Sequence, residues 1–376
     1  LLTEARVLLF YMWQILLPSN AQLGLYHDDF AISRGWLQPF STMLAVIGIA
    51  GFFAVAFLLR KKAPLVAFGL LFFLAGHTLE STIFPLEIAH EHRNYLPMYG
   101  IVLVVFYYLL HPLVQVKSLR ARHVFAVLLI GLFAFITYAR ASNWSNPYDQ
   151  FQAEFLHHTD SAMVNVEMGA IYGNIVSPDA DVMAKNYRMA RGHYERAERL
   201  DSNDTKALFG LILLNAGRGM IVEPEWLKEL GSRLERAPFA PISSDKLVEL
   251  TRCELEGACR LVYTELEDLL KSALRNPTLT GPNQAKVLFA LSTYTINVLG
   301  DYPAALQLMH KMMDVAPQET ASRIALINFL IALQRPDEAR EQLNLLKEMK
   351  SGADMSAQIL SFERELSSGD PDAAPD

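Results

Sequence analysis

Charged side chains are few in the first 140 positions of this 376-residue chain, and the whole chain has only two cysteines. A basic stripe interleaved with aromatic residues is missing and the net charge is −7, so nucleic acid is not an expected partner. Convincing strand alternation is also missing, which argues against a β-sheet protein. No signal peptide is readable. Because the chain opens at Leu1 without a methionine, we expect a fragment of a longer protein.

Long apolar runs fill the part of the chain that lacks charge. They cover residues 41–59, 63–79, 96–116 and 124–139. A helix needs about 20 residues to cross a hydrocarbon core of about 30 Å, and in lipid it satisfies its own backbone groups. Buried helices of a soluble protein are the alternative, which is disfavoured because all four runs fall between residues 41 and 139. The sequence therefore predicts four transmembrane helices in residues 41–140.

Basic residues predict the orientation of these helices. They gather in the first and third connecting loops, as Arg60, Lys61 and Lys62 and as Lys117, Arg120 and Arg122. The positive-inside rule places both loops in the cytoplasm. The loop at residues 80–96 and everything after residue 140 then face outward. We expect a multi-pass protein of the bacterial inner membrane whose C-terminal domain lies in the periplasm.

The first 40 residues predict an interfacial helix followed by an outward loop. Residues 7–18 are too short to span, and Tyr11 and Trp13 are suited to anchoring a helix at the membrane surface. In the loop that follows, Asp28 and Asp29 lie beside His27. Such a carboxylate pair is a candidate site for a divalent cation. The alternative, which we favour, is a solvated loop with turn-forming aspartates.

The loop between the second and third apolar runs is the densest polar segment near the predicted bilayer, where ionisable groups usually serve a site. Its candidate site residues are Glu80, Glu87, Glu91, His92, Arg93 and Tyr95. A helix here would bring Glu87 and Glu91 to one face together with His90. An arginine at this depth is suited to a lipid-linked phosphate, because its guanidinium binds oxygens in a bidentate manner. Zinc bound by His90 and His92 is disfavoured, since this spacing points the two rings apart on a helix.

The second half predicts an array of helix pairs. Residues 285–318 align with residues 319–352 at a period of 34, so that Ala305 falls on Ala339. This is the tetratricopeptide spacing, in which a small residue lies where the two helices cross. We expect a repeat domain over residues 149–352 that binds a partner protein, with a mere spacer as the alternative. Residues 353–376 are expected to end the helical part and to form a disordered acidic tail.

The two cysteines, Cys253 and Cys259, lie six positions apart in the half that is predicted to be outside. An oxidising compartment permits a disulfide that closes a small loop there. As a metal pair, this spacing matches no common motif. We therefore expect the disulfide.

The string PLEIAHEHRNYLPMYG, with the opening LLTEARVLLFYMWQILLP and the repeats, resembles bacterial relatives of the transmembrane and tetratricopeptide-repeat-containing proteins. Their polar loop resembles E-H-R-x-Y-L-P, matched here by Glu91, His92, Arg93 and Tyr95 with the Leu-Pro that follows. The resemblance implies the C-terminal part of a GT-C-type glycosyltransferase that uses a lipid-phosphate-linked sugar. In that family the catalytic acidic residue is thought to lie in the first outward loop, so no catalytic residue can be named here.

The predicted fold is all-α, with transmembrane helices followed by an extracytoplasmic α-solenoid. Two functions stay open. One is a sugar transferase that holds a polyprenyl-phosphate sugar near the polar loop and a protein at the repeats. The other is a non-catalytic adaptor for envelope assembly, whose helices only anchor the repeat domain in the bilayer. The density of ionisable residues in the polar loop favours the transferase, and no cofactor beyond a divalent cation is expected.

Overall fold

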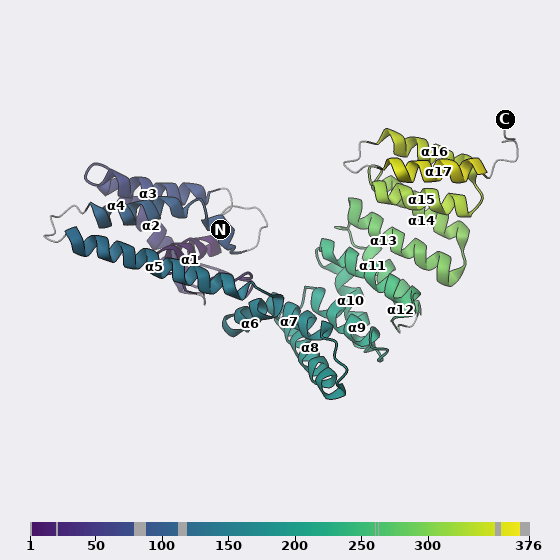
Figure 1. Ribbon diagram of the computed structural model, residues 1–376, viewed down its shortest axis with the longest axis horizontal. Coiled ribbons are helices and arrows are strands. Elements are labelled where there is room, and N and C mark those ends of the chain that lie inside the picture. Colours follow the sequence, from purple (N-terminus) through teal and green to yellow (C-terminus); the bar gives the residue numbers. More distant parts are fainter. Residues whose placement is uncertain are drawn as a thin grey trace. The chain divides into compact units, whose positions relative to one another are not determined.

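The computed structural model describes residues 2–19, 22–78, 88–111, 119–259, 261, 263–349 and 355–368. Over these residues the fold is helical and contains no strand, which confirms the predicted all-α class. The chain divides into two compact units, Leu1–Leu200 (unit 1) and Asp201–Asp376 (unit 2), each described by itself (Figure 1).

The apolar helices of unit 1 form where the sequence predicts them. They are α1 (Leu2–Leu16), α2 (Ser41–Leu59), α3 (Pro64–Gly76), α4 (Met98–Leu110) and α5 (Leu119–Asn143). In the described residues, α2 and the segment His123–Asn143 of α5 are long and apolar enough to cross a membrane. At 1.5 Å per residue, the 13 residues of α3 or α4 span only about 20 Å. Four membrane spans therefore stay a prediction.

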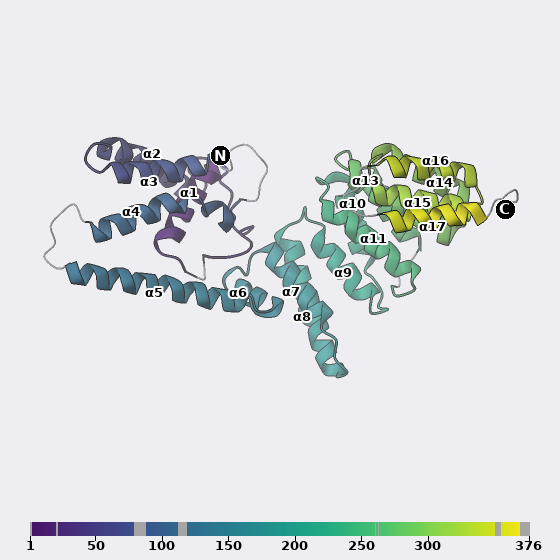
Figure 2. The same ribbon diagram turned by 45° about the horizontal axis from the view of Figure 1, so that its top comes forward.

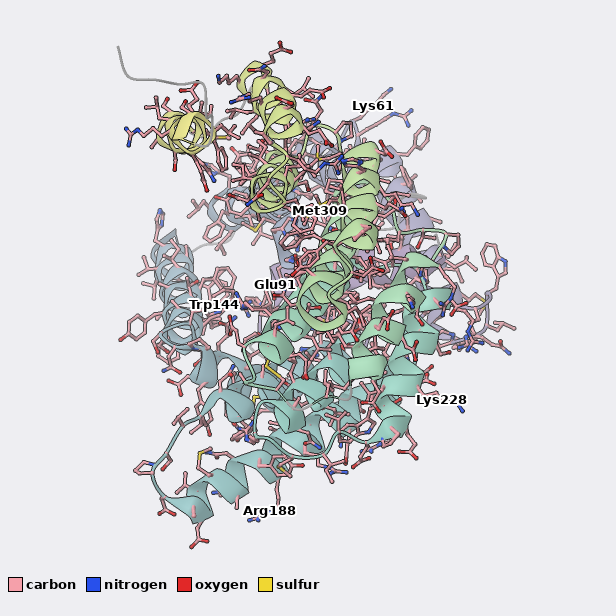
Figure 3. All side chains as sticks on the ribbon, turned by 90° about the vertical axis from the view of Figure 1, so that its right-hand side faces the viewer. Lys61, Glu91, Trp144, Arg188, Lys228 and Met309 are labelled. Carbon is pink, nitrogen blue, oxygen red and sulfur yellow. A yellow bond between two sulfur atoms is a disulfide. The ribbon has the colours of Figure 1, made fainter. Side chains whose placement is uncertain are left out.

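Two facing glycines set the close packing of α3 against α4. A Cβ atom added to Gly69 would lie 2.7 Å from the carbonyl oxygen of Gly100 and 2.5 Å from Cγ2 of Val104. A Cβ atom added to Gly100 would lie 3.0 Å from the carbonyl oxygen of Gly69. Small residues of this kind let two helix backbones approach, which is how helices pack in lipid. At the turn that joins α2 to α3, Lys61 is exposed and points away from the helices (Figure 3).

Unit 1 also contains three further helices, α6 (Pro147–His157), α7 (Ala162–Asn174) and α8 (Ala180–Leu200). The side chain of Asn146 accepts a hydrogen bond from the backbone N–H of Asp149 and caps α6, and Ser161 caps α7 in the same way. The sequence assigns these helices to a repeat domain that begins at residue 149. In the structure they belong to the same compact unit as the apolar helices.

Unit 2 is a stack of helices in which each packs on helices one or two places away in the chain (Figure 2). It comprises α9 (Lys206–Ala216), α10 (Pro224–Arg236), α11 (Pro241–Leu255), α12 (Tyr263–Leu274), α13 (Gly281–Tyr294), α14 (Tyr302–Val315), α15 (Thr320–Ala332), α16 (Pro336–Glu348) and α17 (Ser356–Ser368). Ala305 on α14 and Ala339 on α16 are both fully buried, as expected for small residues at helix crossings. Residues 369–376, predicted to be disordered, lie outside the described residues.

The 34-residue period is also seen in the backbone conformation of the turns between paired helices, where a positive φ recurs. Gly300 follows the helical turn Thr295–Leu299 with a φ of 66°, and Gln334, 34 positions later, lies two residues after the end of α15 with a φ of 55°. The backbone N–H of Arg335 donates to the carbonyl of Leu330 at 2.9 Å, which closes the helix end after a left-handed residue. Only glycine adopts this conformation without steric cost, so the second repeat carries strain that the first does not.

We expect Gln334→Gly to raise the free energy of unfolding of unit 2 by about 0.5–1 kcal/mol, because it removes that strain. The matched control is Gln307→Gly on the exposed face of α14, where glycine weakens a right-handed helix and should lower stability by about 1 kcal/mol. Thermal unfolding of the two variants checks both signs. Equal destabilisation by the two substitutions would contradict the assigned strain.

The two cysteines of unit 2 are bonded to each other. Cys253 lies near the end of α11, and its Cα atom is 5.2 Å from that of Cys259. Gly257 makes the intervening turn possible with a φ of 69°. In the described residues no cysteine is free.

Candidate functional site

The polar loop is positioned by α1. The hydroxyl of Tyr11 donates to the carbonyl of His90 at 3.0 Å and accepts from its backbone N–H at 2.7 Å. The side-chain amide of Asn94 donates to the carbonyl of Tyr11 at 3.2 Å. Tyr11 is almost fully buried, so these bonds fix the second half of the loop to the helix core.

The loop does not form the regular helix that would point the His90 and His92 rings apart. Residues Glu91–Asn94 form one 3₁₀ turn, and His90 before it is extended. The prediction that the His90 and His92 rings point apart is therefore wrong: their Nδ1 atoms are 2.8 Å apart. An extended residue followed by a tight turn brings the rings together, as a regular helix would not. Glu80 and Glu87 lie outside the described residues, so the predicted Glu87–Glu91 face is not part of this description.

Glu91 pairs with an arginine from the opposite end of the apolar region. The Arg140 guanidinium, at the end of α5, donates to Oε2 of Glu91 at 2.6 Å and also donates to the carbonyl of Leu23. About a fifth of the Arg140 side chain and a quarter of the Glu91 side chain are exposed. Arg140 thus joins the polar loop, the loop before α2 and α5 at one point.

Burial controls the charge of Glu91. It raises the pKa of Glu91 to about 7, and the nearby carboxylate of Glu154 raises this pKa while Arg140 lowers it. Oε1 of Glu91 is buried without a hydrogen-bond partner. A carboxyl group that changes protonation near neutral pH is suited to general acid–base chemistry.

An apolar groove of about 550 Å³ leads away from this ion pair between α1, α4 and α5. Its apolar wall includes Ile15, Met98, Val102, Phe133 and Ile136. We call it the α4–α5 groove.

Three of the predicted site residues, Glu91, His92 and Tyr95, line the polar end of the α4–α5 groove together with Arg140. Arg93 is half-buried and does not line the groove. The cation beside Glu91 is therefore Arg140, which the sequence does not single out, and Arg140 rather than Arg93 lines the groove.

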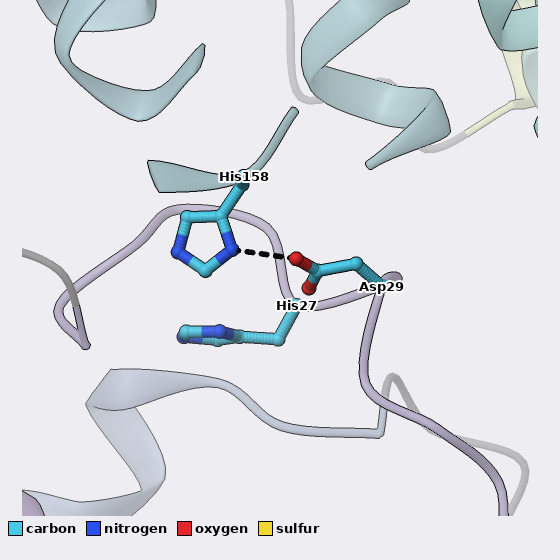
Figure 4. A group of neighbouring side chains, drawn as sticks. All are labelled: His27, Asp29 and His158. Atoms are coloured by element: carbon cyan, nitrogen blue, oxygen red, sulfur yellow. Dashed lines mark hydrogen bonds and ion pairs between the residues drawn. The ribbon is translucent and has the colours of Figure 1, made fainter. Parts of the chain in front are cut away.

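A second cluster lies where the loop before α2 meets the end of α6. Nδ1 of His158 is 2.8 Å from Oδ2 of Asp29, and the His27 ring packs edge-on against the His158 ring with centroids 5.4 Å apart (Figure 4). We call His27, Asp29 and His158 the histidine cluster. Nearby, Oε2 of Glu154 accepts from the backbone N–H of Leu25 at 3.0 Å.

The groups of the histidine cluster have divergent pKa values. Burial, helped by the neighbouring His158, lowers the pKa of His27 to about 4. The hydrogen bond to Asp29 raises the pKa of His158 against the effect of burial. Burial opposes ionisation of Asp29, but its bond to His158 lowers its pKa overall. At neutral pH, His27 is therefore neutral and Asp29 ionised.

The predicted cation pair, Asp28 and Asp29, is divided between two roles. Asp28 accepts from the hydroxyl of Ser161 and from the backbone N–H of Met163 at 3.1 Å, which stabilises the beginning of α7. Its oxygens are thus engaged as the turn interpretation predicts. Only Asp29 points to histidines.

Arg140, Glu154 and His158 were missed by the sequence analysis. Arg140 follows directly after the last apolar run. Glu154 lies on the short amphipathic helix α6, and His158 is the first residue after that helix. One feature of the sequence could have indicated Arg140: an arginine at the end of a long apolar helix favours a nearby carboxylate, and the polar loop contains several. The partner itself lies 49 positions away and is not encoded locally.

No curated protein matches the chain. Yeast Tom70 is similar in structure, with 11% identity and a TM-score of 0.38, over 93% of this chain and 62% of that chain. Pseudomonas aeruginosa pilF (14% identity, TM-score 0.33) is matched over 56% of this chain and 90% of its own. YrrB, described as a tetratricopeptide protein with an unusual peptide-binding site, has 14% identity and a TM-score of 0.28, over 59% and 93%.

The transferase resemblance of the polar loop is not supported by these comparisons and stays a prediction. The repeat prediction is supported, because a family model matches within unit 2. Residues 299–357, which include α14, α15 and α16, match the tetratricopeptide repeat family.

Proposed function

We propose that this protein is a membrane-anchored binding protein whose unit 2 receives a basic segment of a partner protein. The tetratricopeptide match in residues 299–357 carries the proposal, because such arrays bind other proteins. The net charge of unit 2 indicates which kind of partner segment it would bind. Residues 201–376 contain 26 acidic and 18 basic side chains, so unit 2 attracts cations.

A groove between α10 and α12 is the best-defined docking surface for that segment. It has a volume of about 330 Å³, and its lining includes the carboxylates of Glu235, Glu265 and Asp268 but only one basic residue, Lys228. Glu235 is paired with Arg275 at 2.9 Å. Glu265 and Asp268 line the groove from α12, and we propose that these two carboxylates select lysine or arginine in a bound segment.

Charge reversal tests this surface. We expect the full chain in detergent to bind fluorescent lysine-rich peptides in preference to matched glutamate-rich peptides. Asp268→Lys combined with Glu265→Lys should weaken that binding about tenfold or more, since like charges in one groove repel. Asp314→Lys, an exposed aspartate on α14, is the matched control and should retain the preference. Equal binding of both peptide classes would argue against the proposal.

The membrane anchor is proposed from the exposure of the apolar helices. Only 17% of the most apolar window of α2 and 6% of that of α5 are buried. A core helix of a soluble protein would be mostly buried, so these surfaces call for an apolar environment. We propose that lipid covers them, with Lys61 in the cytoplasm and the end of α5 in the periplasm.

Labelling of intact cells tests this orientation. The native cysteines are bonded to each other, so single introduced cysteines report alone. An impermeant maleimide is expected to label Ser145→Cys, just after α5, and to leave Lys61→Cys unlabelled until the membrane is opened. The reverse pattern would exclude the proposed topology.

The second candidate function is transfer of a sugar from a lipid-phosphate carrier, and the α4–α5 groove is the observation that favours it. Its apolar wall suits an isoprenoid chain, and the Arg140 guanidinium at its polar end suits a phosphate. Glu91, with a pKa raised to about 7 by burial, lies beside that position as an acid–base group. The acceptor would be the partner held by unit 2.

Native mass spectrometry in lipid nanodiscs tests this second function. We expect a polyprenyl phosphate to bind and the matching polyprenol to bind at least tenfold more weakly. Ile136→Trp should fill the groove and reduce binding, because Ile136 lies on its wall. Phe135→Trp, on the exposed side of the same helix, is the control and should bind normally. Equal affinity for phosphate and alcohol would remove the support that Arg140 gives.

A further inference from the structure

We propose that the histidine cluster, His27, Asp29 and His158, is a binding site for a divalent transition-metal ion of the zinc type. One ligand atom from each residue, an imidazole nitrogen or a carboxylate oxygen, lies within 4.8 Å of the other two. In tetrahedral zinc sites with bonds of about 2.0–2.1 Å, ligand atoms are about 3.4 Å apart. A small contraction of the cluster would therefore let one ion contact all three.

Unsatisfied nitrogen atoms are the second observation. His27 is 5% exposed and His158 is 8% exposed, so both are more than nine-tenths buried. The Nε2 atom of each has no hydrogen-bond partner. Leaving a buried imidazole nitrogen unpaired costs about 1–3 kcal/mol. Nδ1 of His158 already faces Asp29, so an ion between them would take the place of the shared proton, and the unpaired Nε2 of His27 is the nitrogen that would complete the site.

The backbone at Gly24 approaches His158 closely, which holds the His158 ring in place as a binding site requires. A Cβ atom at Gly24 would lie 2.9 Å from Nε2 of His158 and 3.0 Å from Oε2 of Glu154. Any larger residue would fill the space in front of both atoms. A cavity of about 260 Å³ lined by Arg140, Glu154 and His158 opens beside them and provides an entry path.

The ligand types decide which ion is expected. Two imidazoles with one carboxylate suit zinc and its transition-metal neighbours, whereas Mg²⁺ and Ca²⁺ prefer sites built from oxygen. Three protein ligands leave a fourth position open for water or a small anion from the cavity. The ion would also link the loop before α2 to the end of α6.

Metal retention by the full chain tests the proposal. The protein is purified in detergent with a tag that lacks histidine, stripped with a chelator, loaded with Zn²⁺ or Co²⁺ and desalted. We expect one equivalent of metal to be retained, visible absorption bands of tetrahedral Co²⁺, and a rise in Tm of about 5 °C at a hundredfold excess over Kd. His27→Gln and His158→Gln should each lower the affinity at least tenfold.

Two controls separate this site from other histidines. His157→Gln, next to His158 but exposed, should retain metal as the wild type does. His92→Gln should also do so, although the His90 and His92 rings are close. X-ray absorption of the zinc-loaded wild type, which needs no variant to fold, should show scattering from two imidazoles. A wild type that retains no metal, a bound ion with fewer than two imidazoles, or loss of metal in His92→Gln would overturn the proposal.

Discussion

Arg140→Met should destabilise unit 1 by about 2–3 kcal/mol, because the half-buried carboxylate of Glu91 would lose its charged hydrogen-bond donor. The substitution keeps most of the side-chain volume but leaves Oε2 of Glu91 and the carbonyl of Leu23 without their donor. Oε1 of Glu91 already lacks a hydrogen-bond partner, so in the variant neither oxygen of the carboxylate would accept a hydrogen bond from Arg140 or from another side chain. Thermal unfolding of the full chain in detergent, followed by tryptophan fluorescence, measures the loss; three of the four tryptophans lie in unit 1.

The loss from Arg140→Met should grow as the pH rises. A carboxyl group whose pKa is higher in the folded than in the unfolded state lowers stability as the pH passes from the unfolded to the folded pKa. For wild-type Glu91 this window extends from the ordinary pKa of 4.5 to the raised pKa of about 7, and stability then levels off. Without Arg140, which lowers this pKa, the window extends higher, so the variant should still lose stability above pH 7.

A double variant isolates the pair. Arg140→Met combined with Glu91→Gln removes the charge that Arg140 neutralises and should recover most of the lost stability at pH 8. Glu91→Gln alone should reduce the pH dependence of the Tm between pH 5 and pH 7. If the double variant were as unstable as Arg140→Met alone, the ion pair would not be the cause.

Gly69→Val should disrupt the packing of α3 on α4 and cost about 3 kcal/mol or more. The new side chain would begin 2.7 Å from the backbone oxygen of Gly100, which cannot move away as a side chain can. Overpacking usually costs about 1–3 kcal/mol, and a clash with backbone is at the upper end of that range. The expected readout is a lower Tm and a lower yield of monodisperse protein in detergent.

Gly131→Val is the matched control for this clash. Gly131 lies within α5, and a Cβ atom added there meets nothing within 4 Å. Both variants place the same β-branched residue in an apolar helix, so their helix-propensity cost is the same. Gly131→Val should therefore stay close to wild-type stability. Equal effects of the two substitutions would mean that the Gly69–Gly100 contact does not hold α3 to α4.

The two functional proposals depend on different parts of the molecule and can fail separately. Loss of peptide preference in the charge-reversed unit 2 would leave phosphate binding in the α4–α5 groove unaffected. A groove that binds no polyprenyl phosphate would leave a membrane-anchored binding protein. The metal proposal depends on neither, because its ligands lie outside both the α4–α5 groove and unit 2.

Local patterns in the sequence determined the helices and the repeat. Uncharged apolar runs end at proline, glycine or charge, and α2 coincides with its run, residues 41–59. The alignment of Ala305 with Ala339 corresponds to two buried crossings, because a repeated small residue has the same packing role in each helix pair. Such features depend on neighbours within one or two helical turns, which the sequence contains.

Tertiary structure alone decided which polar groups meet. Glu91 pairs with Arg140, 49 positions later in the chain, and His27 and Asp29 meet His158 about 130 positions later. The polar loop forms a 3₁₀ turn because Tyr11, from a different helix, fixes His90 and Asn94. Pairing over such distances depends on how helices cross and on the free energy of burying each charge, and neither has a local signature in the chain.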